Sequence, residues 1–217
     1  MKKYKIAREL KEISDIYNLS HLPSAISAYP IWLDILCSKK YQNKKIFLGK
    51  PFGFYTFLYI CNKVKILTDN EFQEVMNLLL FAGFDGVINT NQLNYLKSKL
   101  KGKINYKLFL KELKRIKYID STMGSVYSVA RQYSLLKNKE VIVFIPDSVL
   151  IMGEFYESLV QEKINLSKIN LLIDFNTSTK QNKLPLSYKD INYIFSIFNI
   201  NANIYYNKEL KEIGDII

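Results

Sequence analysis

Residues 141–147 read VIVFIPD, and this stretch decides the fold of the 217-residue chain. Its first six residues are uncharged, and five of them are aliphatic or aromatic. A short apolar run of this kind is typical of a strand that is buried on both faces of a parallel sheet. Asp147 and Ser148 end the run, and residues 153–164 have a helical pattern. A strand, a polar turn and a helix form the repeating unit of an α/β fold.

The alternation of strands and helices extends along most of the chain. Short apolar runs predict further strands at 45–48, 171–173 and 202–206. Apolar residues spaced three and four apart predict helices at 3–17, 24–38, 54–62, 68–81, 125–136 and 188–198. Residues 93–116 are lysine-rich and amphipathic, with a break at Gly102, and helices are expected there too.

These elements predict an α/β fold, a three-layer α/β/α sandwich with a mainly parallel sheet. A chain of this length with 48% hydrophobic residues can bury one core. We therefore expect a single domain over residues 1–217, in which residues 63–118 form a divergent helical segment.

The net charge of +11 does not by itself identify a partner. The basic residues are dispersed, and the longest clusters are pairs such as Lys2-Lys3 and Lys44-Lys45. No polybasic tract is visible, so no nucleic-acid partner is expected. Enrichment in Lys, Asn, Ile and Tyr is what an AT-rich genome imposes. An anionic small molecule or an acidic partner subunit is also compatible with the charge.

Two cysteines and the absence of long apolar runs indicate the compartment. Cys37 and Cys61 fit no zinc or redox spacing, so we expect both to be buried thiols in a reducing cytoplasm. The first residues lack a signal-peptide pattern, and no run reaches the roughly 18 to 20 apolar residues of a membrane span. A cytoplasmic protein is expected.

Polar residues follow two of the predicted strands. Asp147 follows one strand, and Asp174, Asn176 and Ser178 follow the next. Ligands of parallel sheets bind at the carboxyl ends of the strands, and Mg²⁺ prefers a few protein oxygens completed by phosphate and water. The two loops therefore predict a magnesium site. The alternative is that these residues are ordinary turn or helix-capping residues.

The order of four motifs resembles the N-terminal, thiamine diphosphate-binding part of transketolase. Residues 20–28, SHLPSAISA, correspond to GHLGSSLSA, and residues 46–53, IFLGKPFG, to FVLSKGHA. Residues 122–132, TMGSVYSVARQ, correspond to SLGQGLSVAVG. Residues 146–158, PDSVLIMGEFYES, and 171–176, LLIDFN, correspond to the cofactor motif that begins GDG, continues through EGxxWEA and closes with DNN.

The resemblance implies a thiamine diphosphate-binding fold and a role for each matching residue. Asp147 and Asn176 would be side-chain ligands of Mg²⁺, and the carbonyl of Ser178 a third ligand. The diphosphate would lie against the cofactor-binding residues Gly124, Ser125 and Ser148. His21 would be the catalytic residue near the thiazolium and substrate, although it could instead cap the following helix. Glu157 would belong to a subunit contact.

The chain also departs from the transketolase pattern. Pro146 replaces the first glycine of GDG, Pro51 or Phe52 the second active-site histidine, and Met152 the glutamate of EG. Ser125 and Val126 replace Gln and Gly of the diphosphate loop. These departures leave open a degenerate, non-catalytic interaction or regulatory subunit.

The family's activating glutamate lies on a pyrimidine-binding domain that this chain is too short to contain. The resemblance therefore implies the N-terminal half of a split enzyme, which works with a C-terminal-half subunit as a dimer or α2β2 heterotetramer. The implied reaction is transfer of a two-carbon ketol unit between sugars or sugar phosphates, with thiamine diphosphate and Mg²⁺ as cofactors.

Overall fold

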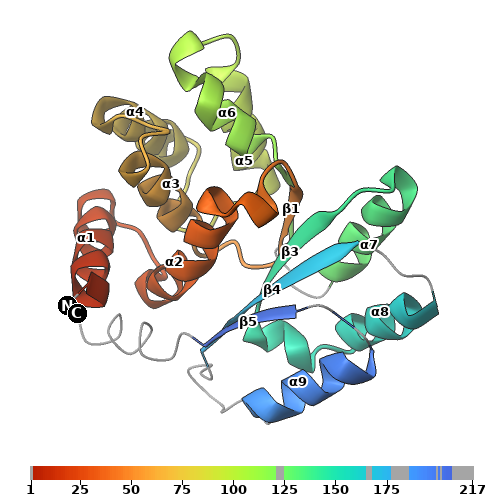
Figure 1. The fold of residues 1–217 in the computed structure, drawn as a ribbon. Helices are drawn as coiled ribbons and strands as arrows, with labels where there is room; N and C mark the ends of the chain where they lie inside the picture. Colours follow the sequence, from red (N-terminus) through yellow and green to blue (C-terminus); the bar gives the residue numbers. More distant parts are fainter. Residues whose placement is uncertain are drawn as a thin grey trace. The chain divides into compact units, whose positions relative to one another are not determined.

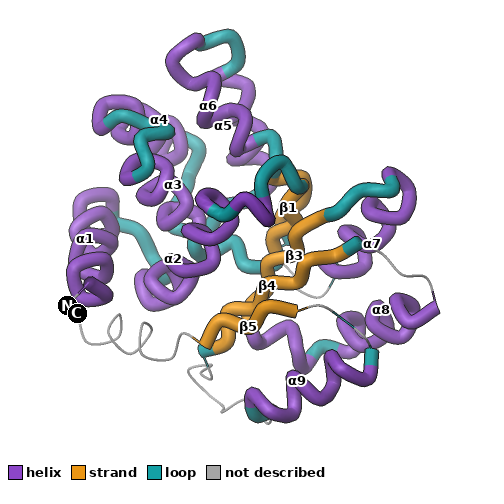
Figure 2. Tube along the Cα trace, viewed as in Figure 1, coloured by secondary structure: helices purple, strands orange, loops and turns teal. Residues whose placement is uncertain are grey.

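The chain is an α/β protein with a five-stranded parallel sheet flanked by helices (Figure 1). The computed structural model describes residues 2–120, 125–164, 168–176, 186–198, 200 and 202–206. At least one helix lies between each strand and the next along the chain (Figure 2), and the architecture is consistent with a three-layer α/β/α sandwich. The predicted fold class is confirmed.

The chain divides into two compact units. Residues 1–42 and 51–116 belong to the first, which we call the helical unit. Residues 43–50 and 117–208 form the second, the sheet unit. The two are described separately below.

The helical unit packs around an aromatic core. The ring centroids of Trp32 and Phe57 lie 5.0 Å apart, and Phe54 lies 5.2 Å from Phe57. No helix in the described part of the chain is long and apolar enough to cross a membrane. The elements are α1 (Lys2–Tyr17), α2 (Leu22–Cys37), η1 (Lys39–Tyr41), α3 (Phe54–Lys63), α4 (Asp69–Phe81), α5 (Thr90–Leu100), η2 (Ile104–Tyr106) and α6 (Lys107–Leu113).

Capping boxes define where two of these helices begin. The Thr68 hydroxyl accepts a hydrogen bond from the Glu71 N–H, and the Glu71 carboxylate accepts one from the Thr68 N–H, at the start of α4. Asn89 and Gln92 form the same reciprocal pair before α5. These bonds satisfy N–H groups that lack a partner within the helix, so the sequence fixes both starts locally.

The sheet unit has the strand order β2-β1-β3-β4-β5. Pairing of β1 with β3, β3 with β4, and β4 with β5 is parallel. The strands are β1 (Lys45–Leu48), β2 (Ile116–Ile119), β3 (Val141–Pro146), β4 (Ile169–Phe175) and β5 (Ala202–Tyr206). The helical elements are α7 (Val126–Lys137), η3 (Asp147–Ile151), α8 (Gly153–Ile164) and α9 (Tyr188–Ile197).

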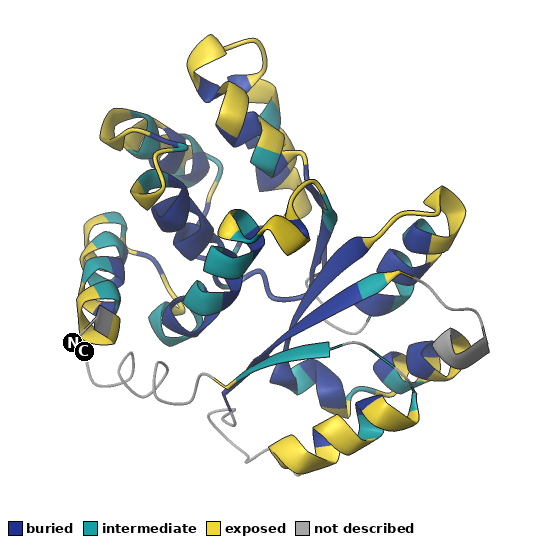
Figure 3. Cartoon of the chain, in the orientation of Figure 1, coloured by how far each residue is buried: buried dark blue, intermediate teal, exposed yellow. Residues whose placement is uncertain are grey.

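One face of this sheet packs against α7, α8 and α9. All six residues of β3 are buried, and β4 is buried from Asn170 onward (Figure 3). Alternate residues of the strands enter the apolar cluster beneath the helices, as the period of two requires. The cluster includes Val143, Ile145, Ile173, Tyr127, Phe155 and Phe195.

One strand was not predicted. Residues 63–118 were expected to be helical, whereas Ile116–Ile119 form β2. The run is only four residues long and contains an exposed lysine, Lys117, so it carries little strand signal of its own. Its strand conformation comes from its place beside β1, which the hydrogen bond from the Asp120 N–H to the Leu48 carbonyl extends.

The expectation that both cysteines are buried is wrong for one of them. Cys61 is buried in α3, whereas Cys37 is exposed. Cys37 lies two residues beyond the buried Ile35 on α2, which turns it roughly 200° away from the buried side of the helix. Burial raises the pKa of the Cys61 thiol. Partial desolvation, followed by the nearby Asp34 charge, raises the pKa of the exposed Cys37, so the reactive thiolate is disfavoured at both.

Gly49, directly after β1, tests how tightly the sheet unit is packed. A Cβ atom there would lie 2.7 Å from Val126 Cγ1 and 3.1 Å from Ile145 Cγ2. We expect Gly49→Ala to lower the free energy of unfolding by about 1–3 kcal/mol through overpacking, measured by urea denaturation. Gly153→Ala is the control, because nothing lies within 4 Å of its added Cβ. Equal effects of the two substitutions would contradict the packing.

Candidate functional site

The strand order creates a topological switch point between β1 and β3. From β1 the chain goes to β2 on one side and then returns to β3 on the other. Ligands of open parallel sheets bind outside the carboxyl ends of strands at such a point. Five polar residues with exposed fractions of 0–7% lie in or just after the carboxyl ends of β1, β2, β3 and β4, and we call them the edge residues. They are Lys50, Asp120, Asp147, Asp174 and Asn176.

Asp147 and Asn176 meet at the carboxyl edge of the sheet. Pro146 and Asp174 are register partners on β3 and β4, so the residues that follow them leave the sheet side by side. The Asp147 carboxylate accepts a hydrogen bond from the backbone N–H of Asn176, at 3.0 Å from Oδ2 to N. The structure therefore brings together the two residues that the sequence predicts as metal ligands.

Asp174 differs from its predicted position. It was expected beyond the end of a strand, whereas it lies inside β4 with no exposed surface. Its Oδ2 forms an ion pair with Nζ of Lys50, which follows β1 and is equally buried. A carboxylate is tolerated inside a buried strand when a cation compensates its charge. The predicted strand ended before Asp174 because the compensating cation, Lys50, is distant in sequence.

Ser125 directs its polar groups toward Asp120. The Ser125 N–H and hydroxyl both donate to Asp120 Oδ2, at 3.0 and 2.9 Å, and its hydroxyl lies 3.2 Å from the Tyr118 hydroxyl. These bonds hold the start of α7 to the end of β2. Gly124 and Ser178 lie outside the described residues. Ser148 lies in η3, next to Asp147, and is half-buried.

Asp120 is a site residue that sequence reasoning missed. It follows β2 as Asp147 follows β3, and both carboxylates accept a hydrogen bond from a backbone N–H. The donor is Ser125, at the start of α7, for Asp120 and Asn176, after β4, for Asp147. The available signal was the sequence itself, in which an apolar residue, Ile119, precedes an aspartate and a serine. The signal was lost because β2 was not recognised as a strand.

His21 belongs to the helical unit. It occupies the N-cap position of α2 with a left-handed backbone, φ 62°, and its side chain makes no capping hydrogen bond. Its ring lies 4.6 Å from that of Phe52, between centroids. Phe52 is one of the two residues that the sequence resemblance sets opposite the second active-site histidine of transketolase. The structure places these two predicted positions side by side.

Two glycines allow the loops around His21 to approach each other. A Cβ on Gly53 would lie 2.7 Å from Ala28 Cβ, so the motif before α3 and the motif in α2 are in close contact. Gly86, with φ +110°, allows its loop to reach Ser20, and the Ser20 N–H and hydroxyl both donate to the Asp85 carbonyl. The His21 loop is therefore held at a fixed place in the helical unit.

The donor set at Asp147 and Asn176 suits a hard cation. A carboxylate and a carboxamide on adjacent loops are oxygen ligands of the kind that Mg²⁺ binds. Within the described residues, no group of three or more His, Cys, Asp or Glu side chains is arranged to hold a metal. Phosphate oxygens and water would have to complete the shell, which is how Mg²⁺ is commonly bound.

Glu157, expected at a subunit contact, is exposed on α8.

No protein family, curated protein or solved structure gives a match to this chain. The chain's own residues and their geometry are therefore what indicate its function.

The Lys50–Asp174 pair predicts a strong energetic coupling. Lys50→Met leaves a buried carboxylate without its cation, so we expect it to lower the free energy of unfolding by about 3–5 kcal/mol. Lys50→Met combined with Asp174→Leu removes both charges and should recover most of that loss. Urea denaturation of both single variants and the double variant measures the coupling. Additive losses would show that the two charges do not stabilise each other.

Proposed function

We propose that the sheet unit binds the diphosphate of thiamine diphosphate through Mg²⁺, and that the chain is the N-terminal-half subunit of a split transketolase-like enzyme. The observation that carries the proposal is the contact between Asp147 and Asn176 at the carboxyl ends of β3 and β4. This is the pair that the resemblance assigns to the metal, and it arises from two loops that are 29 residues apart in sequence.

The edge residues have distinct tasks in this proposal. Asp147 and Asn176 supply oxygens to the cation, while Lys50 and Asp174 neutralise each other beneath them. The Ser125 N–H is directed to Asp120, so Asp120 orients the start of α7, where the diphosphate loop of the family lies. Bound thiamine diphosphate would supply the nucleophilic carbon that accepts a two-carbon ketol unit.

Catalysis requires a second chain in this proposal. The glutamate that activates the cofactor would come from a C-terminal-half subunit, in a dimer or α2β2 heterotetramer. His21 is the proposed group that holds or moves a proton of the sugar or sugar-phosphate substrate. Such an enzyme of central carbohydrate metabolism would work in the cytoplasm.

A non-catalytic interaction or regulatory subunit is the second candidate. The aromatic contact of His21 with Phe52 favours it, because a phenyl ring beside the histidine cannot transfer a proton. The two candidates differ in whether cofactor binding is retained.

Asp147→Asn tests the metal site without disturbing its fold. The asparagine retains an acceptor for the Asn176 N–H but loses the charge that binds Mg²⁺. In titration calorimetry we expect the wild type to bind thiamine diphosphate only with Mg²⁺ or Ca²⁺ present, and Asp147→Asn to give no detectable binding. Glu154→Gln, the same charge change at an exposed residue of α8, should bind like the wild type.

Metal-independent binding, or unchanged binding by Asp147→Asn, would overturn the metal assignment. If the wild type binds no cofactor even with its partner chain present, the non-catalytic candidate replaces the enzyme.

The partner chain is itself open to test. We expect affinity purification from the host to recover a chain that carries a pyrimidine-binding domain. That chain should tighten cofactor binding, because it would contact the other end of the bound thiamine diphosphate. Ketol transfer should be measurable only when both chains are mixed. Activity of this chain alone would contradict the split enzyme.

A further inference from the structure

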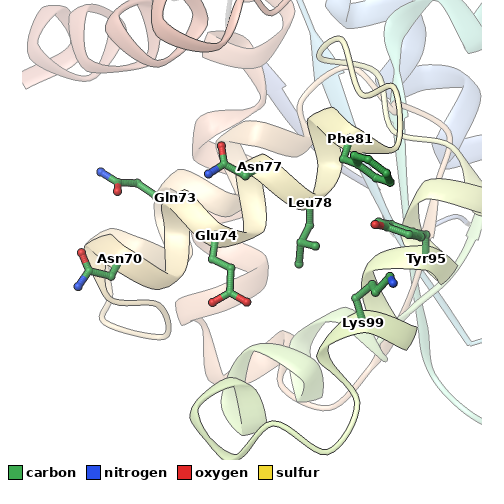
Figure 4. A pocket seen from close by; sticks show the side chains of 8 residues that line it. All are labelled: Asn70, Gln73, Glu74, Asn77, Leu78, Phe81, Tyr95 and Lys99. Atoms are coloured by element: carbon green, nitrogen blue, oxygen red, sulfur yellow. The ribbon is translucent and has the colours of Figure 1, made fainter.

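A second surface, in the helical unit and independent of the proposed cofactor site, has the features of a nucleic-acid interface. A groove with a volume of about 700 Å³ lies along α4 and α5 (Figure 4). Its lining combines an aromatic pair, Phe81 and Tyr95, with three side-chain amides. The amides are those of Asn70, Gln73 and Asn77.

The aromatic pair offers an exposed stacking surface. Phe81 is 84% exposed, and its ring is stacked on that of Tyr95, with an interplanar angle of 25° and a centroid distance of 6.4 Å. Among the large apolar side chains of the described residues, Phe81 is the most exposed aromatic one. Nucleic-acid bases stack on such rings whatever their sequence, because every base has a π-face.

The amide side chains lie on the exposed side of the same helix. Asn70, Gln73 and Asn77 are spaced three and four residues apart along α4, so they lie in one row. Each amide offers both a donor and an acceptor, which suits the mixed hydrogen-bonding edges of bases. Glu74, the acid in the groove, is held by Lys103 and Tyr106, and the hydrogen bond from Lys103, followed by that from Tyr106, lowers its pKa.

Positive charge is concentrated in the adjoining helical hairpin. Residues 90–115 contain eight lysines and arginines and a single acid, Glu112, whereas the rest of the chain has 23 basic and 19 acidic residues. Codon bias that adds lysine evenly does not explain this local lack of acids. The hairpin lies against the groove, since Lys99 lines it and Lys103 contacts Glu74 of α4.

Helix formation aligns lysines that are separated in the sequence. Lys107, Lys111 and Lys114 are spaced four and three apart, which places them on one side at the exposed surface of α6. Lys99 and Lys101 are exposed at the end of α5. Other cations of the hairpin, Lys97, Lys103 and Arg115, form hydrogen bonds or ion pairs within the chain. The cations best placed to contact a polyanion are therefore Lys99, Lys101, Lys107, Lys111 and Lys114.

We propose that the α4–α5 groove and the adjoining lysines bind single-stranded nucleic acid, with bases stacked on Phe81 and Tyr95 and phosphates on the lysines. An acidic protein surface would use the same lysines, and competition with poly-glutamate distinguishes it from nucleic acid. The combination of a basic track with an aromatic platform is how proteins bind single strands without sequence preference.

Fluorescence anisotropy with labelled oligonucleotides of about twelve nucleotides tests the proposal. Each phosphate contact on a single strand contributes about −0.7 to the slope of log K against log salt, so five lysines give about −3.5. Neutralising the surface lysines of α6 in K107Q/K111Q/K114Q should weaken binding and change this slope to about −1.4. The matched control is K137Q/K139Q/K189Q, which removes three exposed lysines of the sheet unit and should leave the slope unchanged.

Phe81→Ala separates base stacking from charge. We expect it to weaken binding about tenfold with the salt slope unchanged. Tyr193→Ala, at a 69% exposed aromatic residue of α9, is the control and should have no effect. Oligoribonucleotides and oligodeoxyribonucleotides compared side by side identify which of the two the groove prefers.

Poly-glutamate competition decides between nucleic acid and an acidic protein. Poly-glutamate that binds as tightly as the oligonucleotides, together with unchanged binding by Phe81→Ala, would overturn the proposal in favour of an acidic partner. Oligonucleotide binding that is lost equally in both lysine triples would overturn it as well, because it would reflect net charge alone. Thiamine diphosphate binding should be unaffected by all these variants.

Discussion

The contact between Asp147 and Asn176 is the constraint on which the candidate site depends. Parallel pairing sets Pro146 opposite Asp174, and the two chains then leave the sheet together. The hydrogen bond from the Asn176 N–H to the Asp147 carboxylate satisfies a buried donor and fixes the orientation of the carboxylate. A site made in this way is positioned by strand register, and a shift of one residue in β4 would turn its side chains to the opposite face.

The ion pair of Lys50 with Asp174 provides the electrostatic setting for that contact. Asp147 directly follows β3, Asp174 lies in the neighbouring strand β4, and both are almost fully buried. Two uncompensated carboxylates so close together would repel each other in a medium of low dielectric constant. Lys50 crosses β3 to neutralise Asp174, since β1 and β4 both lie beside β3. Because Lys50 neutralises Asp174, Asp147 is the carboxylate that we propose for Mg²⁺.

Local patterns explain which parts of the structure were predictable. The strands β1 and β3 and the helices α4 and α8 have strong apolar runs, caps or periodicity in their own residues, and their predicted positions agree with the structure within one or two residues. β2 was missed because its partner strand, not its composition, determines its conformation. Asp174 was misplaced for a related reason, since its cation is 124 residues away in sequence. Of the candidate site, the meeting of Asp147 and Asn176 could be predicted from topology, whereas Lys50 and Asp120 required coordinates.

Charge balance explains why the proposed cofactor site needs a divalent cation. The diphosphate group is strongly negative, and it would approach a carboxylate, Asp147, that is already buried at the sheet edge. Lys50 lies nearby, but its charge is paired with Asp174. Without a cation between them, the carboxylate and the diphosphate would repel each other at short range. A divalent ion that binds both converts this repulsion into two attractions, so metal and diphosphate should bind cooperatively.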